Sequence, residues 1–371
     1  MRALIHETLS GEPITELEIA QASWSTGICR ADVVSVTSSG YTGRSLYQFL
    51  VPRKFALSLL EDDYRVRGAG LLGIPEGGSD DDGLHRVVFP GRGIESYFER
   101  RHVLPYPYWP LVDANGYPLL SRDTRITGVE YGTMMKRLYQ QALTHPGAEL
   151  PVVWEADRSG TRQKEWSAVD GKPVQEAVED ISELLGGVEW DWVPTVDQAD
   201  RLTFSLVTGT DANPELSSAF WHTWQAGGES PDIRGLSVKI SPEFMASTAI
   251  FTGGKEDDRV MVARATSLDL IIAGVPPVEV WDSSHSSVSN QAALDGWAGK
   301  RIEEGQAPVQ YWSFDVRAER ALGLRHGDWC TVEVQDHWLV PNGSYARRVV
   351  EVSGSADGAW LGVTVAGELS W

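Results

Sequence analysis

Asp191 is the residue of this sequence that most suggests chemistry, because it lies directly between Trp190 and Trp192. Tryptophan rings could stack on a sugar, and a carboxylate beside them could be one of the two acids of a glycosidase. The same residues also alternate with period two, as a half-buried strand does. Strand alternation places both tryptophans on one face and Asp191 on the other, and we favour it. With 52 acidic residues in the chain, a carboxylate pair assembled only in space stays open.

Three other segments carry residue types used in binding, and each has a simpler interpretation. Asp80, Asp81 and Asp82 could hold Ca²⁺, but the calcium-loop pattern and its terminal Glu are missing, so a solvated acidic turn fits better. Gly253-Gly-Lys255 lacks the spacing of a phosphate loop, which indicates a hairpin tip. Arg100-Arg101 could bind an anion, but paired surface charge at a domain edge is simpler.

No catalytic motif accompanies these residues. The His-Glu-x-x-His and Gly-x-Ser-x-Gly patterns are absent, and none of the eight histidines lies two or four residues from another. Cys29 and Cys330 form neither a Cys-x-x-Cys pair nor a disulfide framework, so we expect two reduced, mostly buried thiols. The sequence therefore predicts no catalytic residue, no metal ligand and no cofactor, and a protein that is not an enzyme.

Composition limits the classes of partner. A net charge of −20 argues against a basic clamp for nucleic acid, although an acidic wall would let DNA slide past without sticking. Solubility alone explains the charge equally well. There is no run of about 18 apolar residues, and the N-terminus lacks the pattern of a signal peptide. We expect a protein made in the cytoplasm with no membrane span. Fifteen tryptophans favour sheet packing and protein interfaces over sugar stacking.

The clearest secondary structure surrounds Asp191. Apolar residues at helical spacing predict a helix over 174–185, with Asp170 as a nearby cap and Gly186-Gly187 as its stop. Residues 188–193 and 201–207 then alternate with period two, and Pro194 is expected to end the first of these strands. The two strands predict a hairpin that covers the apolar face of the helix.

The chain on either side of this unit is predominantly β. Short strands are predicted at 22–24, 31–36, 55–59, 64–67 and 84–89, and one or two helical turns at 93–101. A proline-containing connector at 102–118 precedes a helix at 129–143, with Met134, Met135, Leu138 and Ala142 toward one side. Later strands are predicted at 236–240, 249–252, 259–263, 278–281, 312–316, 329–334, 347–352 and 360–365, and a helix at 287–304 with Ala292, Ala293, Trp297 and Ile302 apolar.

This order predicts a mixed, β-dominated fold. Two β-barrel or β-sandwich domains of the tube type would flank a smaller α+β unit. The predicted domains are an N-terminal β-barrel-like domain at 1–112, a connector and α+β domain at 113–235, and a C-terminal β-rich domain with one helix at 236–371.

Three groups of segments carry a resemblance. They are Pro52-Arg53 through Ala69-Gly70 with Val87-Val-Phe-Pro-Gly91 and Ser96-Tyr-Phe-Glu-Arg-Arg101; the Asp170-Gly171 helix leading into Glu189-Trp-Asp-Trp192; and Ala249 to Ala263 with Ser289-Asn-Gln-Ala-Ala-Leu-Asp-Gly-Trp297 and Gly327-Asp328. Together they resemble the tail hub proteins of long-tailed phages, which include the baseplate hub and the prophage endopeptidase tail type. In actinobacterial siphophages such proteins are usually described as minor tail proteins.

The resemblance implies a structural virion protein at the tail tip. Such hubs form homotrimers whose β-barrel domains build a pseudo-sixfold ring that closes the tail tube and carries the tip fibre or spike. The implied partners are further copies of the chain, the distal tail or tail tube protein, the tape measure protein and the fibre or spike, with DNA passing through during genome ejection. Some relatives carry a C-terminal peptidase or fibre domain. This sequence ends at Trp371 directly after a strand, so we expect that appendage, and with it lytic activity, to be missing.

Two alternatives stay open at this stage. One is a carbohydrate-binding or cell-wall-degrading tail protein, based on the abundance of tryptophan and acid and on Trp190 and Trp192 as stacking residues. The other is a cytoplasmic scaffold unrelated to phages.

Overall fold

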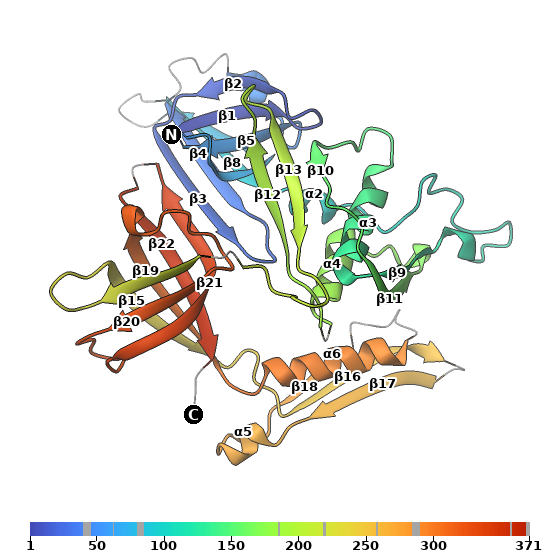
Figure 1. Ribbon diagram of the computed structural model, residues 1–371. Helices are drawn as coiled ribbons and strands as arrows, with labels where there is room; N and C mark the ends of the chain where they lie inside the picture. The colour runs from blue at the N-terminus through green and yellow to red at the C-terminus, as the bar shows by residue number, and fades with distance from the viewer. Residues whose placement is uncertain are drawn as a thin grey trace.

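Strands dominate the computed structural model, which confirms the mixed, β-dominated class (Figure 1). The structure describes residues 1–39, 46–61, 63–79, 85–184, 186–217, 220–256, 259–283, 290–356 and 358–368. The acidic run Asp80, Asp81 and Asp82, Leu185 at the end of the predicted helix, and positions 287–289 of the last predicted helix lie outside the described residues.

The bounds of the elements are as follows. The strands are β1 (Arg2–Glu7), β2 (Pro13–Leu17), β3 (Gln21–Gly27), β4 (Val33–Ser39), β5 (Phe55–Leu60), β6 (Val66–Leu72), β7 (Glu76–Ser79), β8 (His85–Arg92), β9 (Thr124–Val129), β10 (Val152–Val153), β11 (Ser159–Trp166), β12 (Trp190–Val196), β13 (Leu202–Thr208), β14 (Trp221–Ala226), β15 (Ile233–Ser241), β16 (Thr248–Glu256), β17 (Arg259–Thr266), β18 (Glu279–Asp282), β19 (Val309–Arg317), β20 (Trp329–Val334), β21 (Gly343–Ser355) and β22 (Trp360–Glu368). The α-helices are α2 (Glu95–Phe98), α3 (Tyr131–Leu143), α4 (Val174–Ser182), α5 (Asp269–Ile272) and α6 (Gln291–Glu304), with short 3₁₀ turns at Tyr47–Phe49, Leu120–Arg122, Ala168–Asp170 and Ala318–Arg320.

One long strand joins the two β-rich ends of the chain. β21 pairs with β20 and β22 and then continues, so that its residues 351–355 pair with residues 23–27 of β3. The N-terminal strands and the C-terminal strands therefore belong to one sheet, which follows the order β15-β19-β22-β21-β3-β4-β8-β6-β5-β1-β2. Backbone hydrogen bonds, rather than side chains alone, hold these two parts together.

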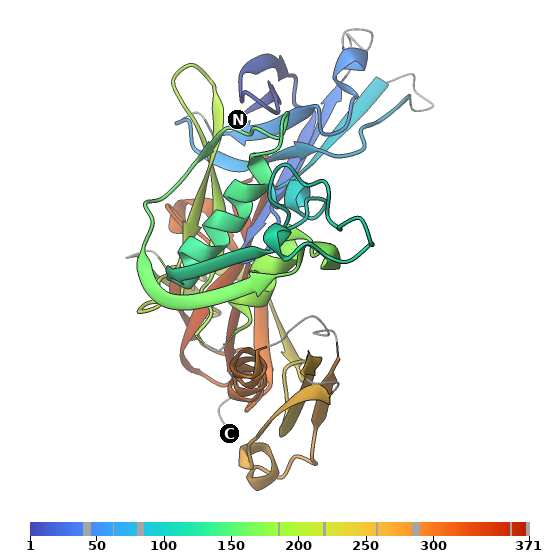
Figure 2. The same cartoon turned by 90° about the vertical axis from the view of Figure 1, so that its right-hand side faces the viewer.

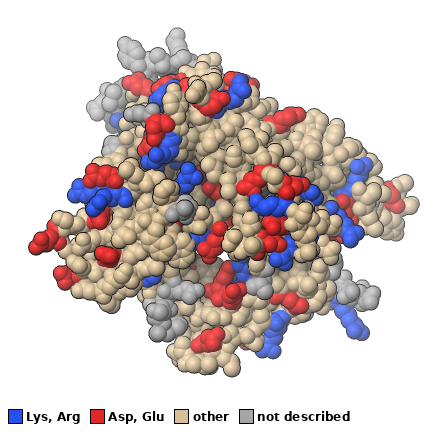
Figure 3. All heavy atoms as spheres, viewed as in Figure 1, with Lys and Arg blue, Asp and Glu red and all other residues tan. Residues whose placement is uncertain are grey.

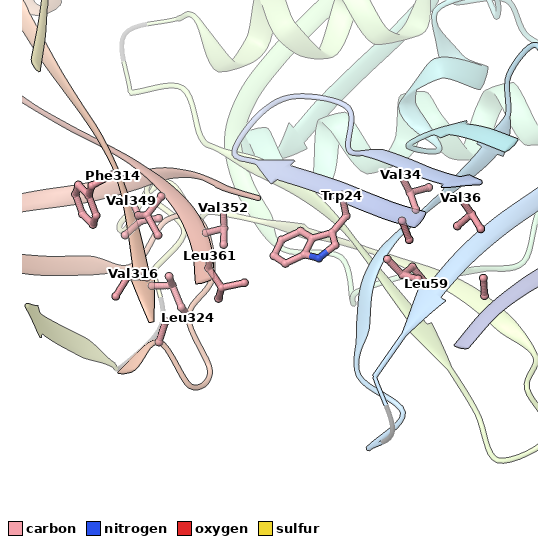
Figure 4. Close-up of a cluster of buried hydrophobic side chains, with 14 of the residues drawn as sticks. Trp24, Val34, Val36, Leu59, Phe314, Val316, Leu324, Val349, Val352 and Leu361 are labelled. Atoms are coloured by element: carbon pink, nitrogen blue, oxygen red, sulfur yellow. The ribbon is translucent and has the colours of Figure 1, made fainter. Parts of the chain in front are cut away.

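The C-terminal strands curl back on themselves. Their order is β14-β20-β21-β22-β19-β15, and the two end strands meet where the Asp232 N–H donates to the Gln225 carbonyl over 2.9 Å. The buried cluster inside continues into the N-terminal part: Figure 4 shows Trp24 between Val352 and Leu361 on one side and Val34 and Leu59 on the other.

Gly354 makes the approach of β21 to β3 possible. A Cβ on Gly354 would lie 2.8 Å from Cζ2 of the Trp24 indole. Trp24 is itself buried, and its ring cannot move without opening the cluster. A side chain at position 354 would therefore push the two β units apart.

The central α+β unit follows the sequence prediction in outline. α3 and α4 pack together and against the hairpin of β12 and β13, in a second buried cluster. Met134, Met135, Leu138 and Ala142 of α3 are all buried, as predicted. The helix predicted from residue 174 is described to Ser182, and Pro173 is its N-cap without a side-chain bond. Asp170 is therefore not the cap; it ends a 3₁₀ turn instead.

The expectation that Pro194 ends the first strand of the hairpin is wrong. β12 continues through Pro194, which lies opposite Phe204, to Val196. The sheet order is β10-β13-β12, so β12 pairs with a neighbour on one side only. Proline is tolerated on such an edge strand, because its missing N–H is not needed by a second neighbour.

The strands β16, β17 and β18 and the helix α6, which covers them, form a small module. It lies at the bottom of the molecule in Figures 1 and 2. The predicted hairpin of the segments 249–252 and 259–263 is confirmed. The helix is apolar along a different stripe than predicted. Trp297 and Ile302 are buried, but Ala292 is exposed and Ala293 half-buried. Leu294 and Ala298 are the other buried residues of α6.

Candidate functional site

Charged side chains gather where three parts of the chain meet. We call Asp32, Glu95, Glu189, Asp191, His326 and Arg348 the junction cluster. Asp32 directly precedes β4, Glu95 opens α2, Glu189 and Asp191 lie at the start of β12, His326 precedes β20, and Arg348 is in β21. The cluster links the N-terminal strands, the α+β unit and the C-terminal strands.

His326 forms the centre of the junction cluster. Its Nε2 lies 2.8 Å from Asp191 Oδ2, and its Nδ1 lies 3.2 Å from Thr26 Oγ1 of β3. Burial acts to lower the pKa of His326, but the hydrogen bond and the charge of Asp191 outweigh burial, so the pKa is raised. The imidazolium form therefore pairs with Asp191 and ties β12 to the turn before β20.

Arg348 makes the second link. Its guanidinium forms a two-pronged pair with Glu189, with one prong at 2.5 Å, and also donates to the Leu216 carbonyl over 2.8 Å. Glu189 in turn accepts from the Leu216 N–H over 2.7 Å. Such forked pairs are among the strongest charge-assisted hydrogen bonds. This pair joins β21 to the start of the β12–β13 hairpin.

Asp32 and Glu95 are the buried acids of the cluster without cationic partners. Asp32 Oδ1 and Glu95 Oε2 have no hydrogen-bond partner among the described residues. Gly93 lies between the Glu95 carboxyl group and the Asp32 backbone, since a Cβ there would be 2.1 Å from Glu95 Oε2 and 2.9 Å from the backbone nitrogen of Asp32. Burial and the charge of Asp191 raise the pKa of Asp32 to about 8. Burial, followed by the charge of Asp32, raises the pKa of Glu95 well above its ordinary value.

Asp32→Asn is expected to change the slope of stability against pH, which is a different quantity from the loss of stability at one pH. The folded chain keeps the Asp32 proton up to about pH 8, whereas the unfolded chain loses it near the ordinary value of 3.8. Above pH 4 the unfolded state therefore binds fewer protons. The free energy of unfolding should fall as pH rises to about 8, with a slope of up to about 1.4 kcal/mol per pH unit. Urea unfolding from pH 4 to pH 9 measures this slope.

The asparagine of the variant is neutral at every pH from 4 to 9. The variant should therefore be more stable than the wild type at pH 8, and its free energy of unfolding should change less with pH. The exposed acid Glu303 provides the control, because Glu303→Gln should leave the slope unchanged. Equal slopes for Asp32→Asn and the wild type would show that Asp32 is ionised in the folded protein.

The line Asp191–His326–Thr26 has the order of a nucleophilic triad, in which an acid orients a histidine beside a hydroxyl. A triad also needs room for a substrate carbonyl and donors for its oxyanion. None of the five best-defined cavities of the described chain is lined by any of these three residues. Nor does any group of three or more His, Cys, Asp or Glu side chains suited to a metal ion occur in the described ranges. The contacts that the structure shows for this line connect β12, β3 and the segment before β20.

The structure places the residues suggested by the sequence at separate points. Trp190 and Trp192 are 1% and 2% exposed, so neither ring is available for a sugar. Trp192 stacks on Phe98 at 5.8 Å between ring centroids. Asp191 lies on the opposite face of β12, which confirms the strand interpretation. Arg101 is tied inward, because its guanidinium donates to the Ala142 carbonyl over 3.1 Å.

The two cysteines and the glycine segment at Gly253 were the other candidates from the sequence. Cys330 is buried and Cys29 half-buried, and neither forms a disulfide. Burial raises the pKa of the Cys29 thiol to about 11, which makes it a poor nucleophile at neutral pH. The expectation that Gly253-Gly-Lys255 forms a hairpin tip is wrong, because the segment lies within β16, with a register shift after Thr252, and Lys255 pairs with Val260 of β17. No helix in the described ranges is long and apolar enough to cross a membrane.

Sequence reasoning missed the junction cluster apart from Asp191. Its members come from five separate places in the chain, and no spacing connects them. The one available signal was position, because each of Asp32, Glu189 and His326 stands just before a strand begins. On the face of the molecule in Figure 3, basic and acidic side chains are interspersed, and no extended basic patch is visible.

Comparison with solved structures gives the fold. The tail protein from Neisseria meningitidis MC58 and the 43 kDa tail protein of prophage MuSo2 from Shewanella oneidensis each align with a TM-score of 0.57 and 12% identity, over 99% of this chain and 97% and 98% of theirs. Prophage tail protein gp18 from Listeria monocytogenes EGD-e aligns with a TM-score of 0.51 and 10% identity, over 100% of this chain and 96% of its own. No protein-family model and no curated protein matches the sequence. The chain therefore shares the fold of these tail proteins along nearly its whole length.

Proposed function

We propose that this chain is a structural virion protein, the trimeric hub at the distal end of a phage tail tube. The observation that carries the proposal is the end-to-end likeness of its fold to prophage tail proteins, with 96–98% of each of those chains covered. A likeness of this extent includes the α+β unit and the small module as well as the β strands. The actinobacterial siphophage source stays a prediction from the sequence.

The way the β units are joined supports a ring-forming role. The shared strand β21 and the continuous core around Trp24 fix the N-terminal and C-terminal strands relative to each other. Three copies would then bring six rigid β units around one axis, which suits the pseudo-sixfold ring implied by the resemblance. Closure by threefold rotation needs a head-to-tail contact between copies. We keep the division into 1–112, 113–235 and 236–371 as part of this proposal.

The proposed partners follow from the position at the tail tip. They are the distal tail or tail tube protein above, the tape measure protein, and the fibre or spike below, with a role in host attachment and genome ejection. DNA would pass through the ring without being bound. The net charge of −20 supports passage over binding, because acidic surfaces repel phosphate.

We propose a structural rather than an enzymatic role. The contacts of the junction cluster connect separate parts of the chain, because His326 binds Asp191 and Arg348 binds Glu189. The carbohydrate-binding alternative is weakened, because Trp190 and Trp192, its expected stacking residues, are buried in the core of the α+β unit.

The oligomeric state tests the proposal. Light scattering should give the mass of three chains, and electron microscopy of the same peak should show a ring with a channel wide enough for duplex DNA to pass. A compact monomer at every concentration, also after mixing with the tail tube protein, would contradict the trimeric hub. Hydrolysis of cell-wall polymer by the purified protein would contradict the structural assignment.

A further inference from the structure

A cavity of about 800 Å³ lies between the α+β unit and the small module. Its upper wall is β11, and its lower wall is the first turn of α6; in both Figure 1 and Figure 2, β11 lies on the side of the α+β unit nearest α6. Interfaces between units are common places for ligand sites, and this volume suits a small organic molecule. None of the junction cluster's members lines this cavity.

Lys164 is the unusual residue of the upper wall. Its neighbours alternate along β11, so Arg162, Lys164 and Trp166 share the inward face while Gln163 and Glu165 are exposed. The Lys164 Nζ is buried and has no hydrogen-bond partner among the described residues. It lies 5.6 Å and 5.0 Å from the ring centroids of Trp166 and Trp297. An ammonium has three donors, and two aromatic faces leave all three without an acceptor.

The other cations of the cavity wall each have an acidic partner. Arg162 pairs with Asp211 at 2.8 Å, and Lys172 with Asp180 at 3.0 Å. Arg125 lies 4.0 Å from Glu165. Lys164 Nζ has no such direct partner among the described residues, although the charges of Asp180 and Glu183 act on it from nearby and Asp170 also lines the cavity. Burial lowers the pKa of Lys164 to about 8. This value is still above 7, so the side chain is mostly charged at pH 7.

The lower wall adds positive potential. Asn290, Ala292 and Ala293 at the start of α6 line the cavity, and Asn290 caps the helix by accepting from the Ala292 N–H over 2.9 Å. The 14-residue helix directs the positive end of its dipole there. Because the cap occupies donors of the first turn, the helix contributes mainly this potential. The small alanine side chains leave room for a ligand to approach.

We propose that this cavity binds a small organic anion whose carboxylate or phosphate group pairs with Lys164 and faces the N-terminus of α6. The apolar body of the ligand would pack against Trp166, Leu184 and Met261, which line the same cavity. A ligand held between β11 and α6 would clamp the small module onto the α+β unit. The competing explanation is that Lys164 only holds Trp166 and Trp297 together by cation–π contact.

Calorimetric titration of the full chain at pH 7 with 2-naphthoate tests the proposal, with inorganic phosphate and the neutral 2-naphthalenemethanol as comparison probes. We expect one saturable site per chain for naphthoate and weaker or no binding of the alcohol. Lys164→Met should weaken naphthoate binding by about tenfold or more, as loss of a charged hydrogen bond does. Saturable phosphate binding that is likewise weakened would identify the phosphate as the better probe of the same site.

The control is Lys54→Met. Lys54 is exposed and also lies over an aromatic ring, 5.3 Å from the centroid of Phe55, but outside the cavity. This variant should bind as the wild type does. If Lys164→Met does not fold, Ala292→Glu replaces it, because an acid in the first helical turn favours the helix while repelling an anion. Absence of saturable binding of both anions in the millimolar range, or equal affinity for the neutral alcohol, would overturn the proposal. Unchanged binding in a folded Lys164→Met protein would leave the cation–π role alone.

Discussion

Ile181→Asp is expected to destabilise the protein by about 4 kcal/mol or more, because it buries a carboxyl group without a partner. Ile181 is fully buried on the apolar face of α4, within the cluster formed by α3, α4 and the β12–β13 hairpin. The residues that surround this face are apolar, so a carboxylate there either stays charged at high cost or takes up a proton. Urea unfolding followed by circular dichroism at pH 7 measures the loss.

Two controls separate charge from packing. Ile272→Asp makes the same substitution at an isoleucine that is 81% exposed in α5, and it should change stability by less than about 0.5 kcal/mol. Ile181→Val removes one methylene from the buried site and should cost about 0.5–1.5 kcal/mol. If Ile181→Asp cost no more than Ile272→Asp, the apolar stripe of α4 would face solvent.

Arg348→Met is expected to cost roughly 2–4 kcal/mol at pH 7. The substitution keeps much of the apolar stem but leaves Glu189 without its cation in a site where the two side chains are 15% and 20% exposed. It also removes the donor to the Leu216 carbonyl. Much of this loss of stability comes from leaving the Glu189 carboxylate without a cation, and less comes from the net contribution of the intact ion pair to stability. Thermal unfolding at pH 7 should show the loss and a lower cooperativity, because the link between β21 and β12 is weakened.

The matched control is an exposed pair of the same type. Arg125 lies 4.0 Å from Glu165, with side chains 68% and 58% exposed, and Arg125→Met should cost well under about 1 kcal/mol. In the double variant Arg348→Met with Glu189→Gln, the stranded charge is absent, so part of the stability should return. Equal effects of Arg348→Met and Arg125→Met would show that the pair at the junction is as weak as a surface pair.

Ile181 and Arg348 hold different parts of the subunit together. Ile181 anchors the α+β unit internally, whereas Arg348 anchors that unit to the C-terminal strands. Under the proposed function, the second variant should impair assembly of the trimer more than its loss of stability alone would predict.

The sequence by itself determined the local structure of this protein and much of its class. The period-two pattern at Trp190, Asp191 and Trp192 and the helical stripes of α3 and α4 depend on neighbours only a few residues away, and the structure agrees with them. β1 and β14 were not predicted. β1 is buried over four consecutive residues and so lacks alternation, and β14 has its two tryptophans three positions apart, at Trp221 and Trp224, which is not the period of a strand.

Only the tertiary structure decided where these elements meet. Pairing of β21 with β3 joins residues more than 300 positions apart, and the alignment of Asp32, Asp191 and His326 depends on that pairing together with the β12–β13 hairpin. The pairing of Arg348 with Glu189 and the position of Lys164 in the wall of a cavity arise in the same way. Periodicity records which face of an element is buried but not what is buried against it, because contacts between distant segments leave no spacing in the chain.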